Sequence, residues 1–252
     1  MAYTLHGSKP MTEVVLDRRS KASKDSAYQK YLEGLTIEER KALEQQVAIE
    51  WNPTYEFEET WDIWEKSLDY ERINKFLIVH FPIKSSASSS LDYVYFVNII
   101  ETANLIQRHY QLFQKYVGFD FDPLSVTLEI KSNDSPFWNK IFNGASSQEK
   151  ICLLGLLFGY GIENSYPFSW YFSNKRSEIE TRFISTLFKS VFLENEPLNT
   201  HHLSSQDFPL PGFKTFSSPN TTLEKYKQER KKIQGFYKNK NLESITLEKL
   251  YN

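Results

Sequence analysis

One segment, residues 151–165, constrains the fold more than any other, because an apolar, helix-like run there meets three glycines and then turns polar. Gly155 and Gly159 are four residues apart, so both fall on one face of a helix and allow a second helix to approach closely. Gly161 then permits a kink or a left-handed turn. We therefore predict that these glycines serve the packing of two helices.

The same segment has an alternative, functional interpretation. Backbone amides near Gly159 and Gly161, at the start of a second helix, could hold an anion. The residue order does not fit a Walker motif, which needs Lys and then Ser or Thr after its last glycine, and Glu163 would repel phosphate. Glu163 could act as an acid or base only if burial raised its pKa. The candidate ligand-binding residues are Gly159, Gly161, Glu163 and Asn164.

The pattern of apolar residues predicts an α+β fold, predominantly α-helical with a small antiparallel β-hairpin. Residues 76–81 and 93–97 are rich in β-branched and aromatic side chains, which favour strands, and a serine-rich stretch, 84–90, joins them. The alternative is that the following helix extends back to Leu91. Residues 1–23, with Gly7, Pro10 and a basic patch, are interpreted as an irregular lead-in.

Helical spacing of apolar residues and capping residues predict the remaining elements. A broad apolar face over residues 178–194 indicates a helix in a central position of the core. The predicted helices cover residues 24–33, 36–50, 99–117, 123–131, 178–194, 223–237 and 246–251, and others start at Pro53, Pro136 and Ser147.

A chain of 252 residues suits one large domain with a sizeable core. We predict a single compact domain over residues 1–252. Within it, residues 195–222 contain four prolines and are expected to form a strap. Residues 223–252 are expected to form a basic helical region packed on the body, because apolar residues line one face of the helix 223–237.

Charge is unevenly distributed along a chain whose formal net charge is only −2. The small net charge argues against a protein-wide field for nucleic acid. Residues 223–240 nevertheless carry seven basic and two acidic side chains, with aromatic residues between them. The candidate anion-binding residues are Arg230, Lys231 and Lys232, and an anionic surface or single-stranded nucleic acid would suit them.

No catalytic constellation is recognisable. Cys152 is the single cysteine, so no intrachain disulfide can form, and its apolar neighbours indicate a buried thiol. The five histidines form no His-Glu-x-x-His motif, and no Gly-x-Ser-x-Gly motif occurs. Asp120 and Asp122 resemble a phosphatase pair, but Asp122 before Pro123 is explained as a helix cap. We predict no catalytic residue, no metal ligand and no cofactor.

Several segments resemble an uncharacterised group of proteins from chlamydiae and related intracellular bacteria. The matching stretches are residues 3–11, 74–79, 97–99, 153–164 and 210–213. The glycine segment followed by Glu163 and Asn164 is the most specific of them. No activity is assigned to such proteins, so the resemblance transfers no functional residues. It implies a bacterial protein associated with life inside a host cell, and it raises the prospect of an exported form.

The sequence thus favours a non-enzymatic binding or interaction protein, with another protein as its expected partner. One alternative is an enzyme with an unfamiliar site at the glycine-rich helix break. The other is a protein that binds nucleic acid or an anionic surface through the basic C-terminal helix. No apolar segment is long enough to span a bilayer, and polar residues follow Met1 directly, so the cytoplasm is the default expectation.

Overall fold

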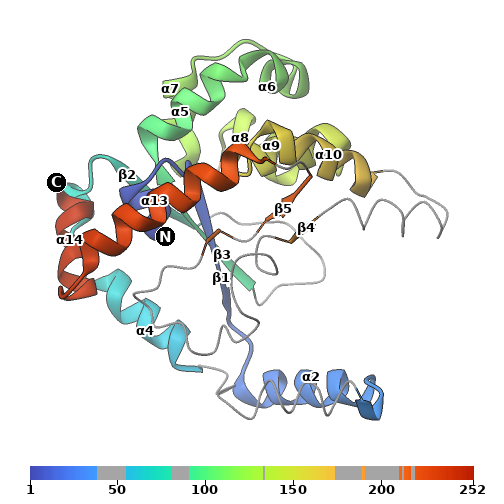
Figure 1. Ribbon diagram of the computed structural model, residues 1–252, viewed down its shortest axis with the longest axis vertical. Helices are drawn as coiled ribbons and strands as arrows, with labels where there is room; N and C mark the ends of the chain where they lie inside the picture. Colours follow the sequence, from blue (N-terminus) through green and yellow to red (C-terminus); the bar gives the residue numbers. More distant parts are fainter. Residues whose placement is uncertain are drawn as a thin grey trace.

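The structure is a computed structural model, and it describes residues 1–38, 55–80, 91–132, 134–173, 189–190, 210–211, 213–216 and 219–252. It has an α+β architecture that is predominantly α-helical and contains a small three-stranded antiparallel sheet (Figure 1). Most of the predicted helix 36–50, the predicted helix start at Pro53 and most of the predicted strap lie outside the described residues. So does most of the predicted helix 178–194, but residues 189–190 form a strand there, so the prediction is wrong at those two positions.

The sheet has the order β1-β3-β2, with β1 at Met11–Asp17, β2 at Phe76–His80 and β3 at Leu91–Asn98. β2 and β3 are antiparallel partners, with Phe76 opposite Asn98, so the predicted pairing of these strands is confirmed. The alternative prediction, in which the following helix extends back to Leu91, is therefore wrong. The irregular lead-in is also wrong, because the first residues form helix α1 (Ala2–His6) and then β1, which pairs with β3 along its whole length.

The central strand β3 contributes to two separate hydrophobic cores. Tyr95 and Val97 point into one core, whereas Val94 and Phe96 point into the other. Successive side chains of a strand project to opposite faces, so this alternation places apolar residues on both faces of the sheet. Both faces are therefore covered, which explains why β2 from Phe76 to Val79 and β3 from Tyr93 to Val97 are continuously apolar or aromatic.

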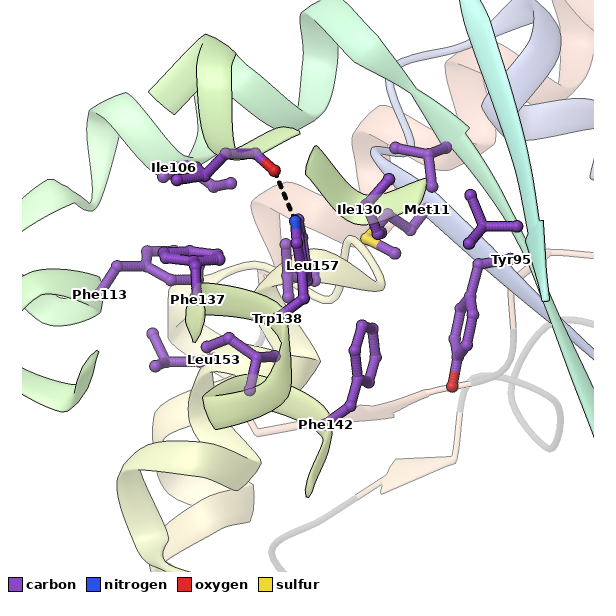
Figure 2. Close-up of a cluster of buried hydrophobic side chains, with 14 of the residues drawn as sticks. Met11, Tyr95, Ile106, Phe113, Ile130, Phe137, Trp138, Phe142, Leu153 and Leu157 are labelled. Atoms are coloured by element: carbon purple, nitrogen blue, oxygen red, sulfur yellow. Dashed lines mark hydrogen bonds between the residues drawn. The ribbon is translucent and has the colours of Figure 1, made fainter. Parts of the chain in front are cut away.

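Helices from the middle of the chain build the core on one face: α5 (Ile99–Arg108), α6 (Tyr110–Val117), α7 (Pro123–Leu128), α8 (Pro136–Asn143) and α9 (Gln148–Leu157), with the short 3₁₀ helix η2 (Glu129–Lys131). Helix α10 (Ile162–Ser173) packs against α9. Trp138, which is fully buried, lies at the centre, with Phe137 edge-on and Phe142 stacked against it (Figure 2). Its indole Nε1 donates a hydrogen bond of 2.5 Å to the carbonyl oxygen of Val126.

Capping residues set the ends of these helices as the sequence predicts. The side chain of Asp122 accepts from the amide of Ser125 at the start of α7, and Ser147 does the same for Lys150 at the start of α9. Gly118 ends α6 in the left-handed conformation. The predicted helix 99–117 is interrupted at His109, so it is two helices.

The opposite face is covered by α4 (Tyr55–Lys66) and α14 (Leu242–Tyr251), and the short 3₁₀ helix η1 (Tyr70–Arg72) leads into β2. Trp61 of α4 and Leu250 of α14 are buried there against the sheet residues Leu16, Phe76 and Phe96. Helix α2 (Lys21–Glu33) lies apart from the sheet (Figure 1), and it ends at Glu33, where the sequence predicts the end of a helix.

The long basic helix α13 (Thr221–Tyr237) packs on α1 by one face (Figure 1). The predicted apolar stripe is confirmed, since its four residues are buried in a third core with Tyr3, Leu210 and Phe213: Leu223, Tyr226, Ile233 and Tyr237. A two-stranded ribbon, β4 (Lys189–Ser190) with β5 (Lys214–Thr215), lies close to α10. None of the described helices is both long and apolar enough to cross a lipid bilayer.

Candidate functional site

The glycine segment forms a tight turn between two packed helices. α9 ends at Leu157 and α10 begins at Ile162, so Gly159 and Gly161 lie in the turn and not on a helix face. Their φ angles are +79° and +73°, a region that glycine adopts at little cost. Gly155 does serve helix packing, because a Cβ there would lie 2.6 Å from Oγ of Ser165 in α10. The packing prediction is therefore correct for Gly155 and wrong for the helical position of Gly159.

Helix α13 covers this turn. The hydroxyl of Tyr226 donates a hydrogen bond of 2.8 Å to the carbonyl oxygen of Gly159. A side chain at Gly159 would collide with the same hydroxyl, and one at Gly161 would collide with Oγ1 of Thr222. The turn thus needs glycine both for its backbone conformation and for the close approach of α13.

Glu163, in the first turn of α10, is bound to the first turn of α13. Its Oε1 accepts hydrogen bonds from the Thr221 hydroxyl at 2.6 Å, the Thr222 hydroxyl at 2.7 Å and the Thr222 amide at 3.1 Å. A carboxylate is also favoured at a helix N-terminus by the helix dipole. Partial burial alone would raise the pKa of Glu163, but these hydrogen bonds outweigh it and the pKa lies below its ordinary value. The raised pKa that acid or base catalysis by Glu163 requires is therefore not found.

Asn164 is buried and serves as a structural link. Its amide nitrogen donates to the carbonyl oxygen of Tyr160 at 2.7 Å, and its Oδ1 accepts from Nδ2 of Asn220 at 2.7 Å and from the amide of Phe216 at 3.3 Å. Asn220 in turn caps α13 by accepting from the amide of Leu223 at 3.0 Å. These bonds account for the Asn164 amide group, which fastens α10 to the residues that precede α13.

A cavity of about 320 Å³ adjoins the turn. Three of the four predicted ligand-binding residues line it, namely Gly159, Gly161 and Glu163, whereas Asn164 does not. Helix α5 forms a second wall, and the first two turns of α13 form a third. The side chains that these two helices contribute are Glu101, Leu105, Arg108, Thr221, Thr222, Lys225 and Tyr226, and His109 follows α5 directly.

The cavity wall carries charges of both signs. Arg108 and Lys225 supply two cations, and Glu101 and Glu163 supply two carboxylates. Within the described part of the chain, neither Arg108 nor Lys225 forms an ion pair or a hydrogen bond through its side chain. Burial and the nearby charge of Arg108 lower the pKa of His109, so this imidazole is neutral at neutral pH.

The anion-binding candidates on α13 lie apart from this cavity. Lys231 and Lys232 are exposed and Arg230 is half-buried, and none of the three lines the cavity. The site residues that the sequence analysis missed are Arg108, Glu101 and Lys225. A signal existed for the first two, because Glu101, Leu105 and Arg108 recur at helical spacing on one face of α5.

A second cluster of titratable groups lies where β2 ends and β3 begins. The two ring nitrogens of His80 lie 2.6 Å from Oε1 of Glu65 and 3.2 Å from Oδ1 of Asp92. Arg18 bridges Asp92 and Asp62 at 3.2 Å and 3.0 Å. Partial burial lowers the pKa of His80, but the hydrogen bonds to Glu65 and Asp92 outweigh it and raise the pKa above its ordinary value. The cluster ties α4 to the sheet.

The remaining candidates offer little chemistry. Cys152 is buried, as predicted, and burial raises the pKa of its thiol to about 11, which disfavours the reactive thiolate. Among the residues with described positions, no group of three or more His, Cys, Asp or Glu side chains is placed to hold a metal ion.

Comparison with known proteins returns no match, whether to a family model, to a curated protein or to a solved structure. The resemblance to the chlamydial group therefore stays a prediction.

Proposed function

We propose that the protein is a non-enzymatic binding protein and that the cavity at the glycine turn is its binding site. The observation that carries the proposal is the cavity itself, with Arg108 and Lys225 on its wall and neither side chain in an ion pair or hydrogen bond with another described residue. Small-molecule sites are concave, largely preformed, and combine apolar lining with a few polar groups. A cavity of about 320 Å³ lies at the small end of such sites, which span about 300–1,000 Å³.

Two features favour binding over catalysis. Glu163 is held in its ionised form by three hydrogen bonds and fixed against α13, so it is a poor proton donor. Neutral His109 could accept a proton, but in the described part of the chain no hydroxyl or thiol is within hydrogen-bonding distance of its ring to act as a nucleophile.

The test is a screen of small polar metabolites by thermal shift, since a ligand that binds the folded state alone raises its melting temperature. Leu105→Trp fills the cavity, and Ile100→Trp places the same bulk on the exposed face of α5, where Ile100 is 57% exposed. We expect hits that stabilise the wild type and Ile100→Trp but not Leu105→Trp. Arg108→Gln, a change at the cavity wall, gives a second test should Leu105→Trp not fold.

Two outcomes would contradict the proposal. One is the absence of any compound that stabilises the wild type. The other is a set of hits that stabilise Leu105→Trp and Arg108→Gln as strongly as the wild type, since those compounds would bind elsewhere on the surface.

A second candidate function is protein interaction through α10. Ile162, Tyr166 and Trp170 are spaced four residues apart on one face of this helix and are 37%, 57% and 45% exposed. Large aromatic side chains with this exposure are frequent at protein interfaces. Light scattering across a range of protein concentrations tests self-association, and Tyr166→Ser should weaken it. A concentration-independent monomer mass, with no effect of the substitution, would count against association of this chain with itself through α10.

A further inference from the structure

We infer that the ligand of the cavity is a small zwitterion with an apolar side group, of the size of an amino acid or a dipeptide. This inference rests on the proposed function and names the chemical class that the cavity wall would recognise. It is carried by four charged side chains that line one cavity without forming ion pairs among themselves: Glu101, Arg108, Glu163 and Lys225.

The balance of charge excludes simpler ligands. A purely anionic molecule would gain from Arg108 and Lys225 but would be repelled by Glu101 and Glu163. A purely cationic molecule would gain from Glu101 and Glu163 but would be repelled by Arg108 and Lys225. His109 is neutral and adds no charge in either case. A neutral molecule would displace water from all four groups and return little, which costs free energy for each charge that it covers. Only a ligand with both signs of charge can satisfy both kinds of group.

The placement of the charges supports the same class. On α5, Glu101 and Arg108 are seven residues apart, which separates their backbone positions by roughly 10 Å along the helix axis. Leu105 lies between them and also lines the cavity. Both long side chains can reach toward a ligand lying over Leu105, one at each end. The wall thus presents an acceptor, an apolar surface and a donor in sequence along one helix.

The other walls of the cavity carry a second carboxylate and a second cation, Glu163 of α10 and Lys225 of α13. Oε1 of Glu163 is occupied by Thr221 and Thr222, and Oε2 takes no part in those bonds. Lys225 follows one turn further along α13. Further apolar lining comes from three residues: Pro10, Leu156 and Ile162. An apolar side group of the ligand would therefore be buried while its charged groups meet Glu101 and Arg108.

The experiment uses L-leucine and L-leucyl-L-leucine as probes, with calorimetric titration of the full chain. N-acetyl-leucine, which lacks the ammonium group, and leucinamide, which lacks the carboxylate, are the matched controls. We expect at least one zwitterion to bind at least about tenfold more tightly than either control, because a hydrogen bond to a charged group is worth about tenfold or more in affinity.

The variants assign each end of the ligand. Arg108→Gln removes the proposed partner of the ligand carboxylate, so the zwitterion should lose at least about tenfold in affinity and bind no better than leucinamide. Glu101→Gln removes the proposed partner of the ligand ammonium group, so the zwitterion should bind no better than N-acetyl-leucine. Lys231→Gln is the matched control, since it removes one charge from the exposed face of α13 outside the cavity. Its affinity should equal that of the wild type.

The outcomes separate this inference from the proposed function. If N-acetyl-leucine or leucinamide binds as tightly as the zwitterions, or if neither zwitterion binds, the inference is wrong. The proposed function then still stands provided that the screen finds other compounds whose binding Leu105→Trp abolishes. If Arg108→Gln and Glu101→Gln bind the zwitterions like the wild type, the assignment of these two residues is wrong.

Discussion

Alanine substitutions at Gly155 and Gly235 give the sharpest test of how α9 and α10 pack. Both glycines lie inside helices, at α9 and α13, and alanine is more favourable than glycine in a helix by about 1 kcal/mol. They differ in their surroundings. A Cβ at Gly235 would meet no atom within 4 Å, whereas a Cβ at Gly155 would lie 2.6 Å from Oγ and 3.0 Å from Cβ of Ser165.

The two substitutions should change the free energy of unfolding differently. Gly235→Ala should stabilise the protein by about 0.5–1 kcal/mol, because it gains helix propensity without a new contact. At Gly155 the same gain is opposed by overpacking against buried Ser165, which costs about 1–3 kcal/mol. Gly155→Ala should therefore be neutral or destabilising by up to about 2 kcal/mol, and the two variants should differ by about 1–3 kcal/mol.

Urea unfolding followed by circular dichroism measures these differences directly. In a thermal melt, 1 kcal/mol corresponds to about 2–4 °C for a chain of this size. Gly155→Ala combined with Ser165→Gly removes the hydroxymethyl group that the new methyl group would meet, and it should recover part of the lost stability. If Gly155→Ala stabilises the protein as much as Gly235→Ala does, the two helices do not approach closely at this position and the packing argument fails.

Three further predictions concern stability. Trp138→Ala should destabilise the protein by about 3–5 kcal/mol in urea unfolding, because it empties the centre of the core and leaves the Val126 carbonyl without its indole donor; a loss below about 1 kcal/mol would contradict this. His80 has a raised pKa in the folded state, so its contribution is fully present below about pH 6.5 and declines as the pH rises through that folded pKa. The stability difference between the wild type and His80→Gln should therefore shrink on going to alkaline pH, and a difference that grows would refute the assignment. Glu163 has a lowered pKa, so Glu163→Gln should cost about 1 kcal/mol above about pH 4.5 by removing the anion at the Thr222 amide, and the cost should vanish as the pH falls through the folded pKa. A cost that persists at acid pH would show that the charge is not the cause.

Local patterns predicted those parts of the fold that local forces decide. The run of β-branched and aromatic residues at 76–80 and the caps at Asp122 and Ser147 act within a few residues of the chain. Strand β1 was missed because Gly7 and Pro10 precede it and its own residues alternate only in part between buried and exposed. Its partner β3 lies about 80 residues away, and no signal within β1 reveals that pairing.

The same distinction between local and long-range signals applies to the candidate site. Gly159 and Gly161 could be identified as special positions from the sequence, because glycine adopts a positive φ at little cost and both residues have one. The sequence nevertheless placed Gly159 on a helix face and not in the turn. The cavity could not be identified, because it exists only where α5, the glycine turn and α13 meet. Asn164 illustrates the difference, since its partner Asn220 lies 56 residues further along the chain. The adjacency of Asn164 to the glycine segment suggested a ligand contact, whereas the fold uses the residue to fasten two helices.

The two-sided character of β3 has a consequence for how this chain tolerates change. Shifting the strand by one residue against its neighbours would exchange the contents of both cores at once, because every side chain would move to the other face. The hydroxyl of Tyr95, which now reaches Glu13, would be turned toward Trp61 and Leu250. An inserted or deleted residue within 91–98 would thus damage both halves of the molecule together, so this strand is where we expect the chain to accept a length change least.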